Sequence, residues 1–299
     1  FSKTAMIATK PEILKFTFSG HDSFQCRQLW LKKGYDFVKE EQSFNSEDAV
    51  VKLGVGKNMV SAIRFWLKAF NIIDNKDKPT EFGIKLFDEE DGYDPYLEDE
   101  ASLWLLHYQL IKTGLASIYS IVFNEFRKEK MFFDKDSFLK YIKIIEESNS
   151  DLSFNENTLG KDFTVFINQY KSDSESKSIE DSFSGVLSEL ELLNSKGKGK
   201  EELFFVENTE RDSLPDAVVL FTILDNPNYG NSISLNALEF DFNSPGSVFA
   251  LNRSGLFAKI SNIAKEYKDI TFTDQAGIKE LQFKNKVDAF SILDMYYGE

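Results

Sequence analysis

One stretch of the sequence combines residue types that bind phosphate with residue types that read bases. From Val51 to Ala69 there is no acidic residue. Basic and polar residues recur there at steps of four, three and four, which places them on one face of a helix over about residues 57–70. These residues are Lys57, Ser61, Arg64 and Lys68. Cations suit DNA phosphates and short polar side chains suit base edges, so this face predicts DNA binding. The full candidate set is Lys52, Lys57, Asn58, Ser61, Arg64 and Lys68.

The elements that must position this face have the pattern of a helix-turn-helix. Gly54 falls where the chain has to bend with a positive φ, and apolar residues occupy the positions where two helices cross. The crossing residues are Ala49, Leu53, Val55, Val60 and Ile63. The opposite side of the second helix is apolar at Val60, Ile63, Leu67 and Phe70. Residues 71–83 then favour a hairpin with a polar tip, so a winged helix-turn-helix is predicted.

A second cluster of reactive residue types lies near the beginning of the chain. His21, Asp22 and Arg27 fall within seven residues, after a predicted strand over residues 13–18. Histidine transfers protons near neutral pH and arginine stabilises phosphoryl charge, so these three residues are candidates for catalysis. The alternative is a capped turn in which Asp22 or Ser23 starts the following helix. The only other histidine, His107, lies in an apolar segment and is expected in the core.

No cofactor is evident from the motifs, and the metal is unknown. Cysteine and histidine are too few for a structural zinc site, and no nucleotide-binding glycine motif is present. An acidic loop offers oxygen ligands that would suit Mg²⁺ if the protein cleaves DNA, but such a loop can equally be a solvated surface. Its carboxylates are Asp88, Glu89, Glu90, Asp91 and Asp94.

Composition limits the class of protein. The chain has 299 residues, 42% of them apolar, and 29 phenylalanines, enough for a sizeable core. Its one cysteine, Cys26, cannot form an internal disulfide, which fits a reducing compartment. No apolar run approaches the roughly 18 residues of a membrane span, and the first twenty residues lack the order of a signal peptide. We therefore expect a cytoplasmic protein with no membrane partner.

The net charge of −14 taken alone argues against nucleic acid, but it is spread unevenly. Residues 1–86 carry a net charge of +4 and residues 87–299 carry −18. A basic N-terminal module is thus attached to an acidic body. Because phosphate repels the acidic body, any DNA contact is expected to be local.

The predicted fold class is α+β, mainly helical with short β-hairpins. We expect a winged helix-turn-helix over 1–90, a helical connector over 91–150 and a C-terminal α+β domain over 151–299. In that last domain a helix, a basic tip over 193–200 and a strand over 202–206 follow in the order of a second winged helix. A strand is also predicted over 247–251.

Four segments of the chain together resemble a bacterial family, number 4007 among the domains of unknown function. They are residues 18–34, 49–69, 91–107 and, more weakly, 243–251. Members of that family occur in DNA backbone phosphorothioation systems. The resemblance implies a component of a single-strand system that nicks DNA as a partner of sulfur-transfer proteins. It carries over no catalytic residues, so His21, Asp22 and Arg27 are candidates from the sequence alone.

Three hypotheses follow for the function. The first is a DNA-binding component of an anti-phage phosphorothioation system that binds double-stranded DNA, works with other proteins of that system and nicks one strand. The second is a non-catalytic adaptor or regulator that binds DNA and recruits partner proteins through its acidic body. The third is that the basic helix docks on an acidic protein surface. The steep salt dependence of phosphate contacts separates the last two.

Overall fold

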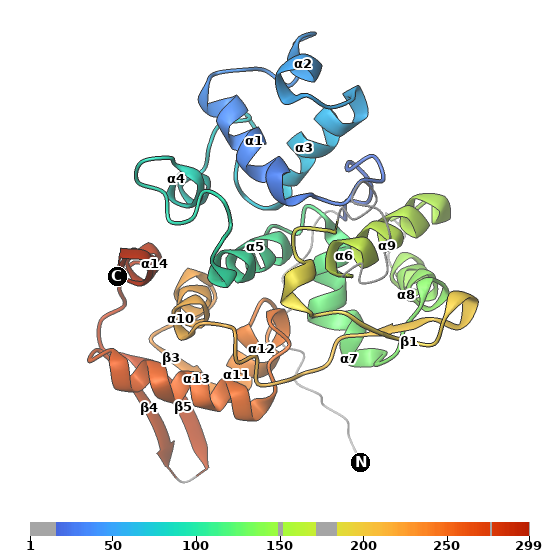
Figure 1. The fold of residues 1–299 in the computed structure, drawn as a ribbon. Coiled ribbons are helices and arrows are strands. Elements are labelled where there is room, and N and C mark those ends of the chain that lie inside the picture. Colours follow the sequence, from blue (N-terminus) through green and yellow to red (C-terminus); the bar gives the residue numbers. More distant parts are fainter. Residues whose placement is uncertain (1–15, 149–151, 172–183, 276, 299) are drawn as a thin grey trace. The chain divides into compact units, whose positions relative to one another are not determined.

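The computed structural model describes residues 16–148, 152–171, 184–275 and 277–298. Residues 17–207 and residues 208–297 form two compact units, and each is described by itself. Both are built mainly from helices, with small antiparallel sheets (Figure 1). The α+β class predicted from the sequence is therefore confirmed at that level. No described helix has the length and apolarity needed to cross a bilayer.

The larger unit begins with four helices. They are α1 (Gln28–Lys39), α2 (Ala49–Leu53), α3 (Lys57–Ala69) and α4 (Glu81–Phe87). α1, α2 and α3 pack against one another. α2 ends at Gly54, whose φ of 62° is the left-handed value expected for the turn. Between α3 and α4 the chain forms a hairpin closed by one isolated β-bridge, Ile73 to Pro79.

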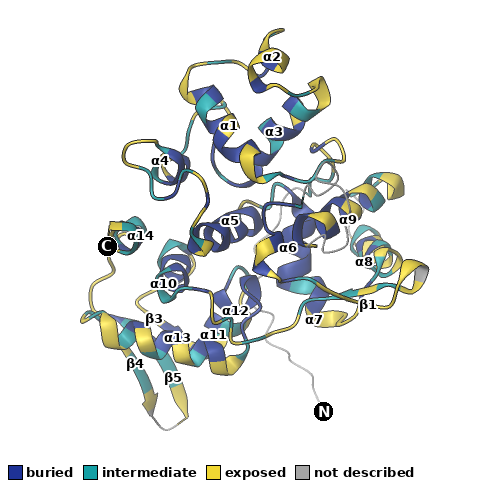
Figure 2. Ribbon diagram, in the orientation of Figure 1, coloured by how far each residue is buried: buried dark blue, intermediate teal, exposed yellow. Residues whose placement is uncertain are grey.

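The rest of this unit surrounds a central helix, α5. The helices are α5 (Glu100–Thr113), α6 (Ser117–Ile121), the π-helix η1 (Val122–Phe126), α7 (Arg127–Glu129), α8 (Lys135–Ser148), α9 (Glu156–Tyr170) and the short 3₁₀ turns η2 (Ser188–Leu190) and η3 (Gly199–Glu201). The strands β1 (Asn194–Lys196) and β2 (Leu203–Phe205) pair antiparallel. Every residue of α5 from Ala101 to Ile111 is buried, which Figure 2 shows as a dark blue helix.

The predicted domain boundaries near residues 90 and 150 both fall inside this larger unit. A helix that is apolar on all sides must be covered on all sides. α5 and α6 lie between the two predicted boundaries and pack against each other. α5 also packs against α3, which precedes the first boundary, and against η2, which follows the second. The described residues therefore separate at 207/208, and the hairpin β1–β2 belongs with the N-terminal helices.

The smaller unit combines a three-stranded antiparallel sheet with helices. The sheet has the order β3 (Ser232–Ser234), β5 (Ile278–Phe283), β4 (Ile270–Gln275). The helices are α10 (Asp216–Asp225), α11 (Leu235–Phe240), α12 (Pro245–Val248), α13 (Arg253–Glu266) and α14 (Ala289–Gly298). α13 packs against α10 and against β4, so that it links the sheet to the helical layer.

Two predicted strands are not strands where the structure describes them, and residues 13–15 of the first lie outside the described residues. Of residues 13–18, the described part is irregular, and the backbone N–H of Thr17 donates to the hydroxyl of Ser117 (2.8 Å). Of residues 247–251, the first two belong to α12. Ser244 caps that helix by accepting the N–H of Ser247, and Pro245 occupies its first position. The winged-helix arrangement of either region stays a prediction.

Candidate nucleic-acid interface

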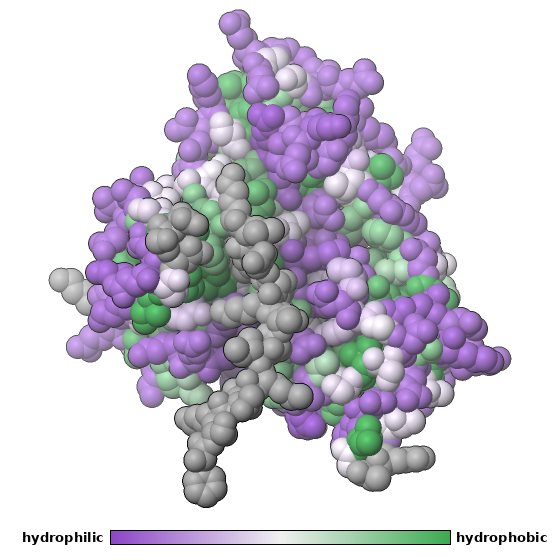
Figure 3. Space-filling view, turned by 180° about the vertical axis from the view of Figure 1, so that it is seen from behind, coloured by the Kyte–Doolittle hydropathy of each residue, from purple (hydrophilic) through white to green (hydrophobic). Residues whose placement is uncertain are grey.

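Helix α3 has the two faces that the sequence predicts. Its apolar face is buried, with Val60, Ile63 and Leu67 each at most 4% exposed. The first half of the opposite face is open to solvent. The residues exposed there are Lys57, Asn58 and Ser61. The surface around α1–α3, at the top of Figure 3, is mainly hydrophilic. The first half of α3 can therefore meet a polar partner without rearrangement.

In the second half of this polar face of α3, the cations are already paired with an acidic residue from the following hairpin. The carboxylate of Asp77 accepts from Arg64 Nε (3.0 Å) and Nη2 (2.6 Å), and Lys68 Nζ lies 2.9 Å from it. Arg64 also donates to Asn45 Oδ1 (3.3 Å), and Lys68 to the carbonyl of Asn75 (3.3 Å). Burial acts to raise the pKa of Asp77, but the hydrogen bonds and charges of Arg64 and Lys68 outweigh it and hold that pKa below its usual value.

The cations of the candidate set thus differ in what they already contact. Lys52 pairs with Asp48 (2.6 Å) and also donates to the side chain of Gln42. Lys57 makes no ion pair with any described residue. Asp77 lies outside the helix that the sequence pattern describes, and it reaches the α3 face only because the hairpin folds back.

His21 is buried between two helices that lie far apart in the sequence. Its Nε2 lies 3.2 Å from Asp162 Oδ1 of α9, and its Nδ1 accepts the backbone N–H of Ser23 (3.2 Å). The ring stacks on Trp66 of α3, with ring centroids 5.6 Å apart. Asp162 also accepts the N–H of Ser19 with both oxygens. Since both ring nitrogens are engaged, His21 holds the loop to α3 and α9.

The loop from Ser19 to Ser23 has an unusual backbone. Four of its five residues have positive φ, among them Asp22 at 46°. A Cβ at Gly20 would lie 2.6 Å from the ring of Phe65, so only glycine fits there. The Asp22 side chain is exposed, whereas the guanidinium of Arg27 lies 5.3 Å from the centre of the Trp30 ring. The three catalytic candidates therefore have different surroundings, and their catalytic role stays a prediction.

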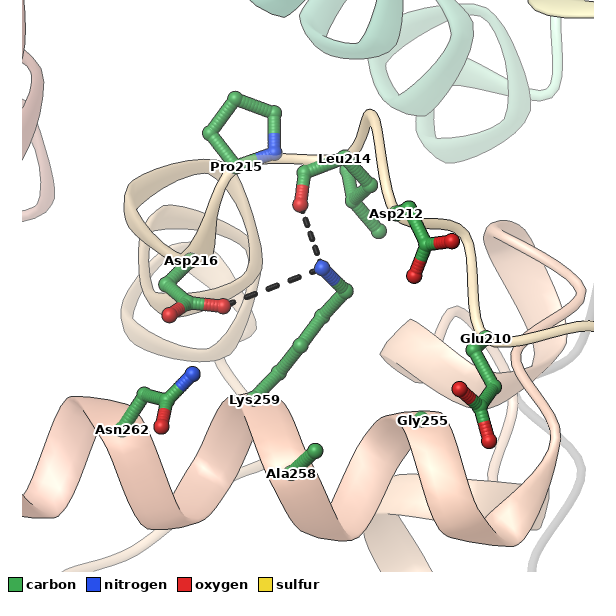
Figure 4. Close-up of a pocket in the computed structure, with 9 residues that line it drawn as sticks. All are labelled: Glu210, Asp212, Leu214, Pro215, Asp216, Gly255, Ala258, Lys259 and Asn262. Carbon is green, nitrogen blue, oxygen red and sulfur yellow. Dashed lines mark hydrogen bonds and ion pairs between the residues drawn. The ribbon is translucent and has the colours of Figure 1, made fainter.

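The smaller unit has a pocket of about 350 Å³ that the sequence pattern does not predict. Figure 4 shows Lys259 of α13 reaching to the carbonyl of Leu214 and to Asp216, whose carboxylate lies 3.8 Å away. Burial lowers the pKa of Lys259, and the charges of Asp216 and Asp212 oppose that effect. Lys259 and Asp216 are far apart in the sequence, so no local motif marks the site.

Most of the chain matches the model of one protein family. The model described as Protein of unknown function (DUF4007) matches residues 18–297. The chain belongs to this family. The resemblance stated from the sequence is thus confirmed, and the match runs through both compact units of this DUF4007 protein. No curated protein sequence matches the chain.

Solved structures give a second relationship for this DUF4007 chain. It is similar to an SspB crystal structure and to a magnesium ion-bound SspB crystal structure. In each case the sequence identity is 27%, the TM-score is 0.81, and the match covers 94% of this chain and 88% of the other. The similarity therefore extends well beyond helices α1–α3.

The magnesium-bound relative makes the acidic loop after α4 worth testing for ligands. Asp88 pairs with Lys39 (2.7 Å) and accepts the N–H of Glu90, and these bonds lower its pKa to about 2. Asp94 is buried and accepts the N–H of Glu98 and the hydroxyl of Ser102. Within the described ranges, no three acidic, histidine or cysteine side chains are grouped to hold a metal. Asp88 and Asp94 thus already serve an ion pair and the turns of the loop, and the described carboxylates are not arranged as a Mg²⁺ site.

Proposed function

We propose that this chain is a DNA-binding component of a bacterial DNA phosphorothioation system. The observation that carries the proposal is the open first half of α3, where Lys57, Asn58 and Ser61 stand exposed above a buried apolar face. The N-terminal half of a recognition helix is the part that meets base edges in helix-turn-helix proteins. The similarity to SspB structures supports a role in a phosphorothioation system. The net positive charge of residues 1–86 supports DNA as the ligand.

The binding of a duplex oligonucleotide across a salt series tests this proposal. Each phosphate contact steepens the dependence of log affinity on log salt by about 0.9. We expect steep salt dependence for the wild type and a slope lower by about one for Lys57→Gln. Lys265→Gln on α13 is the matched control, since it removes one exposed cation from the other unit. Equal slopes for the two variants would exclude Lys57 as a phosphate contact, and with it the open first half of α3 as the observation that carries the proposal.

In its finer form the proposal includes a nick in one DNA strand. A nick would expose a backbone position at which sulfur can replace oxygen. We expect conversion of supercoiled plasmid to the open circle in the presence of Mg²⁺ and none in the presence of a chelator. If purified protein leaves the plasmid supercoiled under both conditions, the enzymatic part of the proposal is wrong, while DNA binding is tested separately by the salt series.

A non-catalytic adaptor is the second candidate function. The observation in its favour is that both ring nitrogens of His21, the one histidine among the catalytic candidates, already have partners in a buried position. In this reading α3 binds DNA and the acidic body recruits other proteins of the system. A plasmid that is bound but never cut supports the adaptor. A protein that binds no DNA supports docking of α3 on an acidic protein surface.

A further inference from the structure

Arg64 and Lys68, in the second half of α3, form an anion-binding site that the carboxylate of Asp77 already occupies. Two cations one helical turn apart converge on one carboxylate, with three nitrogens within 3.0 Å of its oxygens. Arg64 meets the carboxylate in the bidentate manner that guanidinium groups use for carboxylate and for phosphate alike. The cluster is partly exposed, with side-chain exposures of 33% for Arg64, 19% for Lys68 and 24% for Asp77.

The residue that fills the site belongs to a small element. Asp77 lies near the tip of the hairpin after α3, in the left-handed region with φ 59°. One isolated β-bridge, Ile73 to Pro79, closes the hairpin, and Asp74 orders its turn by accepting the N–H groups of Lys76 and Lys78. The backbone N–H of Asp77 donates to the carbonyl of Asp74 (3.1 Å), within the same turn. Displacing Asp77 therefore requires movement of a hairpin tip and not of the core.

We propose that Arg64 and Lys68 form a preformed binding site for one DNA phosphodiester, which the Asp77 carboxylate occupies in the free protein. This inference rests on the proposed function and deepens it. The DNA phosphate replaces the carboxylate on the same three nitrogens, and Asp77 moves into solvent. No covalent bond changes in this exchange.

The exchange changes how strongly the two cations contribute to DNA affinity. A free cation gains a phosphate and releases condensed counterions from the DNA. Arg64 and Lys68 must first lose a carboxylate, so their net contribution is smaller than that of the unpaired Lys57. Asp77 thus sets a threshold that weakens non-specific binding, since only DNA that places a phosphate against both cations recovers the lost bonds.

Substitution of Asp77 gives the direct test. We expect Asp77→Asn to bind a duplex of arbitrary sequence about three- to tenfold more tightly at moderate salt, with a slope steeper by about one to two. Glu47→Gln is the matched control, because it removes one exposed acidic charge beside α2 without a partner on α3. Tighter binding by Asp77→Asn than by Glu47→Gln supports the inference, and equal or weaker binding overturns it.

Arg64→Gln adds a second test, whose first comparison is made with Asp77 in place and does not need Asp77→Asn to fold. With Asp77 in place, Arg64→Gln should cost less affinity than Lys57→Gln, and in the Asp77→Asn background it should cost clearly more. If Arg64→Gln has the same effect on DNA affinity in both backgrounds, the inference that Asp77 occupies a phosphate site is overturned. If Lys57→Gln weakens binding while the Asp77 variant behaves as Glu47→Gln does, the inference fails and the DNA-binding function stands. If no variant and no wild-type protein binds duplex DNA, both fail.

Discussion

Reversing the three cations of the α3 face is expected to weaken DNA binding by roughly a hundredfold or more. The variant carries Lys57→Glu, Arg64→Glu and Lys68→Glu. Each lost phosphate contact costs of the order of 1 kcal/mol, and each new carboxylate adds repulsion. Two of the new carboxylates also lie beside Asp77, which loses both of its partners. Fluorescence anisotropy with a labelled duplex measures the change.

The control for this variant changes the net charge by the same amount, but in the smaller unit. Lys265, Lys268 and Lys284 are exposed in the smaller unit, and their reversal to glutamate alters the total charge equally. If long-range repulsion by the acidic body governs binding, both triple variants lose the same affinity. If α3 is the contact, only the α3 variant loses most of it. Circular dichroism should show equal helix content for both variants, because all six side chains lie outside the core.

The sequence predicts α3 well because its information is local. A helix repeats every 3.6 residues, so its apolar and polar faces can be assigned from spacing alone. The helix expected over 57–70 is observed as Lys57–Ala69, with the predicted residues buried. The turn at Gly54 is likewise confirmed by its positive φ, since few residues other than glycine accept that conformation.

Contacts between distant segments were not predictable in this way. Asp162 reaches His21 across 141 positions, and no spacing rule connects a loop to a helix so far away. Asp77 is only thirteen residues from Arg64, but its effect depends on how the hairpin folds back. The predicted strand over 247–251 fails for a different reason. A β-branched and aromatic run favours a strand, and the cap at Ser244 together with Pro245 overrides it locally.

The buried contact between His21 and Asp162 supports the second large prediction. We expect Asp162→Ala to lower the free energy of unfolding of the larger unit by about 3 kcal/mol or more. Asp162 is 2% exposed and accepts the backbone N–H of Ser19 as well as pairing with His21. Its removal leaves the buried His21 ring and the part-buried N–H of Ser19 without their acceptor, and a buried donor that loses its acceptor costs roughly 1–3 kcal/mol. All three tryptophans lie in this unit, so fluorescence during urea denaturation follows its unfolding alone.

The same measurement separates a structural His21 from a catalytic one. If His21 acts as a clamp, meaning that it only holds its loop to α3 and α9, His21→Ala and Asp162→Ala should each lower stability and the double variant should lose little more. Any nicking activity should then fall only in proportion to the folded fraction. A catalytic His21 predicts lost nicking with an unchanged midpoint of unfolding. Glu156→Gln is the control, because it removes an exposed carboxylate from the same helix, α9. His21 binds Asp162 with one ring nitrogen and the Ser23 backbone with the other, so we expect the outcome of a clamp.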